Sequence, residues 1–127
     1  MSFDIINPTP PGRPNGWNNG MLGPAGGRIL FVAGQTAPEA EGLVEQWERA
    51  LERVLAVVRA AGGTPQDIGR MTVYVTDRPG YLSLQRPLGE VHQRLMGRHY
   101  PAMSLVEVSA LVDSGALVEI EATAVIP

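Results

Sequence analysis

The chain has 127 residues, of which 10 are basic and 13 acidic, so its formal net charge is −3. This length predicts one domain over residues 1–127 that can bury a substantial core. The acidic balance argues against a nucleic-acid partner, because binding phosphates requires clustered cations. No apolar stretch approaches the roughly 18 residues of a membrane span, and the N-terminal residues lack the basic and apolar regions of a signal peptide. We therefore expect a cytoplasmic protein with no membrane partner.

The residue types that are missing exclude most covalent and metal chemistry. There is no cysteine and no lysine, since all ten cations are arginine. Disulfides, thiolate nucleophiles and zinc–thiolate sites are therefore excluded, as are a Schiff-base lysine and a P-loop of the usual kind. Only two histidines are present, His92 and His99, which cannot form a three-histidine metal site in one chain. We expect no metal.

Glycine and proline dominate the N-terminal part of the chain. Phe3 to Ile6 is a candidate short edge strand, but residues 7–20 cannot form regular structure. That segment is either a disordered arm or an ordered loop. We favour an ordered loop docked on a surface that the sequence does not identify, because Trp17 is costly to leave in water. Residues 28–34 form an apolar run after a Gly-Gly turn, which predicts a buried strand.

Residues 43–61 are the clearest helix. The Gly62-Gly63 pair that follows is typical of a left-handed cap, and Thr64 to Asp67 has the pattern of a single capped turn. The apolar residues that recur at helical spacing are Leu43, Trp47, Ala50, Leu51, Val54, Leu55 and Val58.

The second half of the chain alternates strands with a less regular helix. Residues 71–76 alternate as a half-buried strand, and residues 77–80 are expected to form a turn. Residues 81–97 are helical in pattern, with Pro87 expected to begin a new stretch. Two closing strands are predicted over residues 102–108 and 117–126.

These elements predict an α+β domain with one sheet and two helices packed on one of its faces. Met103 and Leu105 share a strand parity with Glu107. We place these residues on the face away from the helices, which is therefore expected to be half apolar and half acidic. A face of this kind is expected to be covered by another subunit, which predicts an oligomer with sites at subunit boundaries.

Several short motifs then occur in a characteristic order and spacing: Ala33-Gly34-Gln35, Ala60-Ala61-Gly62, Thr72 to Asp77, Tyr100 to Ser104, Val106-Glu107-Val108 and Val118 to Ala122. In this combination the chain resembles, over nearly its whole length, the RidA family, also called YjgF or endoribonuclease L-PSP. The resemblance implies a chorismate-mutase-like fold with one mixed sheet. It also implies a homotrimer with a central barrel and ligand clefts between the subunits.

The same resemblance implies a chemistry. Typical members hydrolyse reactive enamines and imines to 2-keto acids and ammonia without a cofactor. An arginine binds the substrate carboxylate, and a glutamate is thought to position the attacking water. In this chain the glutamate position is Glu119, but the arginine of the family's Pro-Ala-Arg-Ser motif is Met103. A thioether cannot bind a carboxylate, so this chain is a divergent member.

The resemblance also implies substrate-binding positions around that arginine. Leu105 occupies a position that is often cysteine, Trp17 that of a loop aromatic, and Arg86 that of a frequent asparagine. Ser104 is a further candidate donor. Each of these residues also has a structural interpretation without a function. Glu119 could be a strand carboxylate that faces solvent or an intersubunit arginine, and Ser104 an ordinary strand residue. Met103 could pack in the core, Trp17 could anchor its loop, and Arg86 could be a solvated cation at a helix end.

Two functions follow as hypotheses. The first is a cofactor-free hydrolase, or deaminase, of an imine, an enamine or a related small metabolite, with Glu119 orienting water. If its substrate is anionic, Arg86 or an arginine of a neighbouring subunit must bind it. The second is a non-catalytic trimer that binds a metabolite in the same cleft, which the loss of the arginine favours. A structural domain with a vestigial cleft remains a third reading, and ribonuclease activity finds no support in the sequence.

Overall fold

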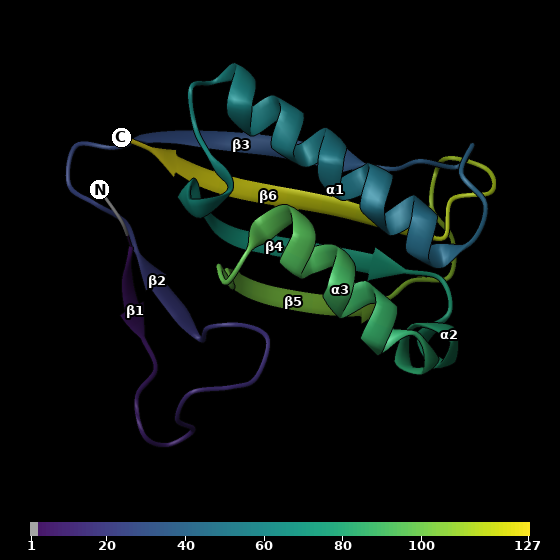
Figure 1. The fold of residues 1–127 in the computed structure, drawn as a ribbon, viewed down its shortest axis with the longest axis horizontal. Coiled ribbons are helices and arrows are strands. Elements are labelled where there is room, and N and C mark those ends of the chain that lie inside the picture. Colours follow the sequence, from purple (N-terminus) through teal and green to yellow (C-terminus); the bar gives the residue numbers. More distant parts are fainter. Residues whose placement is uncertain (1–2) are drawn as a thin grey trace.

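The computed structural model describes residues 3–127 and has a mixed sheet with helices over one face (Figure 1). The strands lie in the order β3-β6-β4-β5, with β4 and β5 parallel and the other neighbours antiparallel. This arrangement confirms the predicted α+β class. The sheet strands are β3 (Arg28–Gln35), β4 (Ile68–Val75), β5 (Ala102–Glu107) and β6 (Val118–Ile126).

The core lies between the sheet and two long helices, α1 (Leu43–Ala60) and α3 (Gln85–Met96) (Figure 1). The apolar stripe predicted for α1 is buried from Trp47 to Val58, which places that face against β3 and β6. Gly62 has φ of 87°, a left-handed conformation that favours glycine, so the predicted end of this helix is confirmed. Among residues 3–127 no helix is both long and apolar enough to span a membrane.

The segment after α1 also follows its sequence pattern. A 3₁₀ turn, η1 (Pro65–Asp67), leads into β4, and the backbone N–H of Thr64 donates to Asp67 Oδ2 over 2.7 Å. The buried Asp67 side chain thus satisfies a backbone donor at the start of the turn. The predicted capped turn is present.

The segment between β4 and α3 differs from the prediction. Residues 77–80 do not form an isolated turn; they open a short helix, α2 (Arg78–Ser83), in which the Gly80 N–H donates to Asp77 Oδ1 over 3.1 Å. The helical region breaks at Leu84, and Pro87 lies in the first turn of α3. A proline is tolerated there because the first N–H groups of a helix have no intrahelical acceptor.

The N-terminal strand is confirmed as β1 (Asp4–Ile6), paired with a strand that the sequence did not predict, β2 (Gly20–Leu22). This hairpin lies apart from the main sheet (Figure 1). The loop between its strands is ordered and docked at the β5 edge. Its anchor is Asn18, which is 8% exposed and whose Nδ2 donates to the Tyr100 carbonyl over 2.7 Å.

The predicted position of Met103 and Leu105, on the face of the sheet away from the helices, is wrong. Met103 and Leu105 pair in register with Met71 and Val73, which are buried under the helices. Both side chains therefore lie on the helix-covered face, and they do not make the opposite face apolar. The face away from the helices, the open face, is apolar through other residues: Ile29 and Phe31 of β3 are 63% and 78% exposed there. Beside them β6 presents Glu119, Glu121 and Thr123, and β4 presents Thr72 and Tyr74.

Candidate functional site

A cavity of about 540 Å³ lies beside β5, the edge strand of the sheet. Met103 and Leu105 reach it from β5, because alternate residues of this strand point to the helix-covered face. On α3 the lining residues Gln85, Leu88, Gly89 and His92 fall at spacings of three, four and seven, which places them on one side of the helix. The cavity therefore lies between that side of α3 and the outer edge of the sheet.

Two stacked ring pairs form much of the cavity wall. Trp47 of α1 stacks on Tyr81 of α2 with ring centroids 5.8 Å apart and an interplanar angle of 13°. His92 of α3 stacks on Tyr100, before β5, at 5.0 Å and 6°. Trp47 is only 6% exposed, and its buried indole Nε1 has no hydrogen-bond acceptor among the residues that the structure describes. A buried donor without an acceptor is unfavourable.

The loop between β1 and β2 closes one side of the cavity with Asn15, Gly16 and Trp17. Trp17 is 44% exposed, so its own burial does not hold the loop in place. Its neighbour Asn18 does: besides the bond to Tyr100, the Asn18 backbone N–H donates to the Pro101 carbonyl over 3.2 Å. The anchored backbone holds Trp17 next to the start of β5.

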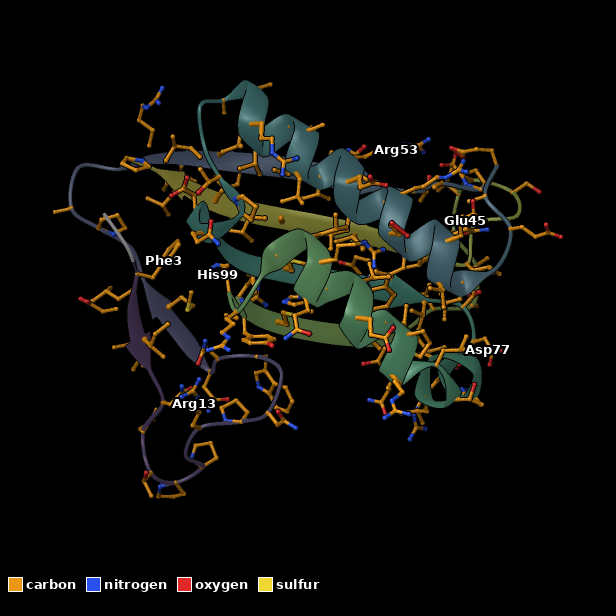
Figure 2. The ribbon with its side chains drawn as sticks, in the orientation of Figure 1. Phe3, Arg13, Glu45, Arg53, Asp77 and His99 are labelled. Atoms are coloured by element: carbon orange, nitrogen blue, oxygen red, sulfur yellow. The ribbon has the colours of Figure 1, made fainter. Side chains whose placement is uncertain are left out.

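A hydrogen bond of His92 shows which of its ring nitrogens carries the proton, and burial keeps the ring neutral. Its Nε2 lies 2.9 Å from the carbonyl oxygen of His99, and a carbonyl only accepts, so this nitrogen carries the proton. Burial lowers the pKa of His92 below its usual value, so the ring is neutral at pH 7. His99 in turn lies 2.7 Å from the Ile68 carbonyl through Nε2, and Phe3 stacks on its ring (Figure 2). The two histidines thus tie α3 to β4 and to the N-terminal hairpin.

The pKa of His92 leads to a prediction about stability. Because its pKa is lower in the folded than in the unfolded chain, the unfolded chain binds more protons between the two values. The contribution of His92 to the free energy of unfolding is therefore present above about pH 6.5 and is lost as the pH falls below that value. Urea unfolding at pH 7.5 and pH 5.0 is expected to show a smaller loss of stability in His92→Gln than in wild type. An equal loss in both would contradict this account.

The cavity lining contains no arginine, aspartate or glutamate. Arg86, a predicted binding residue, is exposed in the first turn of α3 and lies outside the lining, although its neighbour Gln85 belongs to it. Arg94, further along α3, pairs with Glu48 of α1 at 2.7 Å. The cavity is thus apolar and aromatic, with amide and hydroxyl groups but no fixed positive charge.

Glu119 and Ser104 lie on the other face of the sheet. Ser104 is exposed on β5, where it alternates with Met103 and Leu105 and therefore points to the opposite face of the sheet. Glu119 is half-buried on β6 and opposite Tyr74 of β4. Its side chain lies over Gly34 of β3, where an added Cβ would be 2.4 Å from Glu119 Oε2. Within one chain, then, Trp17, Met103 and Leu105 lie together at the cavity, while Glu119 lies on the opposite face.

A second carboxylate accompanies Glu119 on the open face. The hydroxyl of Tyr74 donates to Glu121 Oε2 over 3.3 Å. Partial burial and the negative charge of Glu121 raise the pKa of Tyr74, so the phenol stays protonated and keeps this hydrogen bond. Glu121 therefore accepts a hydrogen bond from Tyr74. Glu119, the other carboxylate of β6, has no hydrogen-bond partner within residues 3–127.

Apart from Trp17, sequence reasoning did not identify the aromatic residues of this cavity. Trp47 has the spacing of a core residue, and Tyr81 was predicted to be helical without any signal that it meets Trp47. His92 and Gln85 are seven residues apart, a signal of a shared helix side, but that spacing does not show which surface the side meets. Over residues 3–127 no group of three or more His, Asp or Glu side chains could hold a metal ion.

Comparison with known proteins places this chain in a family. The family model described as Endoribonuclease L-PSP matches residues 14–126. A RutC family protein of Pyrococcus abyssi is 34% identical over 105 residues, which cover 77% of this chain and 79% of the relative. The chain therefore belongs to the endoribonuclease L-PSP family, to which RidA proteins belong.

Individual relatives extend the similarity to structure. TdcF of Escherichia coli, which carries the provisional name reactive intermediate deaminase, is 34% identical over 108 residues, covering 78% of this chain and 80% of TdcF. A crystal structure of TdcF with bound serine matches 99% of this chain and 94% of that one with a TM-score of 0.66. The crystal structure of the Rid family protein YyfB of Yersinia pestis, described as of unknown function, is 30% identical in sequence. The match covers 99% of this chain and 100% of YyfB, with a TM-score of 0.81.

Proposed function

We propose that the chain forms a homotrimer with a small-molecule site at each subunit boundary, and that this site hydrolyses an imine or enamine without a cofactor. The observation that carries the proposal is the separation of two halves of a site. The cavity lies at the edge strand β5, while Glu119 lies on the open face of the same sheet. A second copy that packs its open face against the β5 edge would bring the two halves together.

The exposed apolar side chains of the open face support association between copies. Phe31 and Ile29 of β3 and Val106 of β5 are 78%, 63% and 44% exposed. Large apolar side chains grouped on one sheet face are typical of an interaction surface. The outer edge of β5 also has unpaired backbone groups, since no strand of residues 3–127 pairs with it beyond the single bridge between Asn18 and Ala102. Burying both features between copies would remove an apolar surface and an open edge.

The reaction needs a group that holds and deprotonates water. A carboxylate near the substrate accepts a proton from water while the water oxygen forms a bond to the imine carbon, and the resulting carboxyl group returns that proton to the imine nitrogen. The carboxylate then transfers the hydroxyl proton of the carbinolamine to the nitrogen, and the carbon–nitrogen bond breaks, releasing ammonia and leaving a carbonyl product. Glu119 is suited to this role because it lies at the sheet surface and has no hydrogen-bond partner in the described chain.

A second candidate function is a non-catalytic trimer that binds a metabolite in the same cleft. It is favoured by the cavity lining, which contains neither a cation nor a carboxylate. The serine bound by TdcF has a carboxylate, but at the position where the family has its carboxylate-binding arginine this chain has Met103. Under this alternative the cleft would bind its ligand without accelerating any hydrolysis.

An imine-hydrolysis assay distinguishes the two functions. Purified protein would be added to 2-iminobutyrate made in situ by a dehydratase, and separately to the imine of benzaldehyde made in situ by an amine oxidase. The hydrolase proposal predicts that release of the carbonyl product accelerates in proportion to the protein concentration for at least one imine. If neither reaction accelerates while a ligand binds to the cavity, the non-catalytic alternative holds.

A further inference from the structure

We propose that the cavity selects an uncharged, planar ligand with an aromatic or similarly flat apolar group, in place of a small carboxylate. This inference deepens the proposed function, on which it rests, by naming the class of substrate: a neutral imine of the form aryl–CH=NH or aryl–CH₂–CH=NH. It is carried by the charges and the shapes of the side chains that line the cavity.

The charge of the lining is the first argument. Among residues 3–127 of one chain, no side chain that lines the cavity carries a positive charge at neutral pH, because His92 is the only basic residue among them and its ring is neutral. The Nε2–H of His92 is already donated to the His99 carbonyl. Moving a carboxylate from water into such a site is unfavourable unless a cation compensates it. Met103, at the position of the family's arginine, offers only a polarisable thioether.

The shape of the lining is the second argument. The stacked pairs Trp47–Tyr81 and His92–Tyr100 present flat rings from the helices and from the segment before β5. Trp17 adds a third aromatic surface on the loop side. A volume of about 540 Å³ is within the range of pockets that hold drug-sized ligands and is much larger than a three-carbon acid requires. Flat apolar ligands gain most from such walls, because aromatic rings stack on one another.

Polar groups at the cavity suit a neutral acceptor. Gln85 and Asn15 contribute side-chain amides, and Tyr81 and Tyr100 contribute hydroxyl groups. An imine nitrogen or a carbonyl oxygen that reached one of these donors would gain a hydrogen bond without bringing a charge into the cavity. The hydrolysis of such a substrate consumes one water and yields an aldehyde and ammonia, so no further reactant is needed.

Intrinsic tryptophan fluorescence tests the ligand class directly, because the chain has two tryptophans and both line the cavity. The probes are 2-phenylacetamide and phenylacetate, which have nearly the same shape but differ in charge. At pH 7.5 we expect the amide to change the fluorescence at a concentration about tenfold or more below that needed for phenylacetate. In Met103→Arg the preference is expected to reverse, because a guanidinium binds a carboxylate through two hydrogen bonds.

Ala56→Arg serves as the matched control. Ala56 is exposed on α1 and does not line the cavity, so this variant adds the same charge elsewhere and is expected to keep the wild-type preference. Tighter or equal binding of phenylacetate by the wild-type protein would overturn the inference. So would a lack of response to both probes in a protein that hydrolyses 2-iminobutyrate, an outcome that leaves the proposed function standing. If neither probe binds and no imine is hydrolysed, both proposals fail.

Discussion

Glu119→Gln is expected to lower the rate of imine hydrolysis by about 10²–10³-fold, in the range that removing a general base produces. Glutamine has nearly the same size and can still hydrogen-bond water, but it cannot take its proton. Ligand binding in the cavity, measured by tryptophan fluorescence, is expected to be unchanged, because Glu119 lies outside the cavity lining. The comparison of kcat with the binding constant for one imine would check this prediction.

Gly34→Ala provides an independent test of the same carboxylate. The methyl group would be 2.4 Å from Glu119 Oε2, 2.6 Å from its Cδ and 2.8 Å from its Cγ, so the flexible side chain must move aside. We expect this variant to lose activity while it keeps a free energy of unfolding close to that of wild type. If both Glu119→Gln and Gly34→Ala retained wild-type kcat, Glu119 would have no part in the reaction.

Phe31→Arg is expected to convert the proposed trimer into monomers. The side chain of Phe31 is 78% exposed in the single chain, and the proposed assembly buries it in each of its copies. Burying a phenylalanine contributes about 1.5–3 kcal/mol per copy, and an arginine left unpaired in its place would add an unfavourable term. Sedimentation velocity would measure the change in mass, and circular dichroism would show that the fold is kept.

Ala56→Arg is again the control, since it adds a positive charge to the exposed side of α1. It is expected to remain trimeric at the concentration at which Phe31→Arg is monomeric. Monomers of Phe31→Arg are also expected to lose imine hydrolysis, because Glu119 and the cavity then no longer meet. A wild-type protein that is monomeric at micromolar concentration would contradict the assembly.

Much of the fold could be predicted because its elements have regular patterns. The stripe from Trp47 to Val58 and the alternation of Met71, Val73 and Val75 are properties of single elements, and the structure buries these residues as expected. The three-residue strand β2 has too few residues for an alternation to be recognised. The start of α2 at residues 78–80 was predicted as a turn, because Asp77 followed by Pro79 and Gly80 is a pattern common to turns and to helix starts.

The site was harder to predict because it depends on which elements meet. Alternation along the strand puts Met103 and Leu105 on one face of the sheet, but it does not show whether the helices cover that face. The pairing of Met103 with the buried Met71 shows that they do. The ring stack of Trp47 with Tyr81 joins residues far apart in sequence, and that of His92 with Tyr100 depends on how the chain turns between α3 and β5, so no helix or strand pattern reveals either. The resemblance to a family supplied Trp17, Met103 and Leu105, which the structure brings together at the cavity.

The most direct test of a site shared between copies is complementation by mixed trimers. Glu119→Gln keeps the cavity but lacks the carboxylate. Gly89→Trp fills the cavity but keeps Glu119, since Gly89 lies in the lining and an added Cβ there meets no heavy atom within 4 Å. Each variant alone is expected to be inactive. A mixed trimer contains two copies of one variant and one copy of the other. In both cases one of its three boundaries combines an intact cavity with an intact Glu119, so about one third of the wild-type activity should return. Mixed trimers as inactive as their parents would show that the site is not shared between subunits.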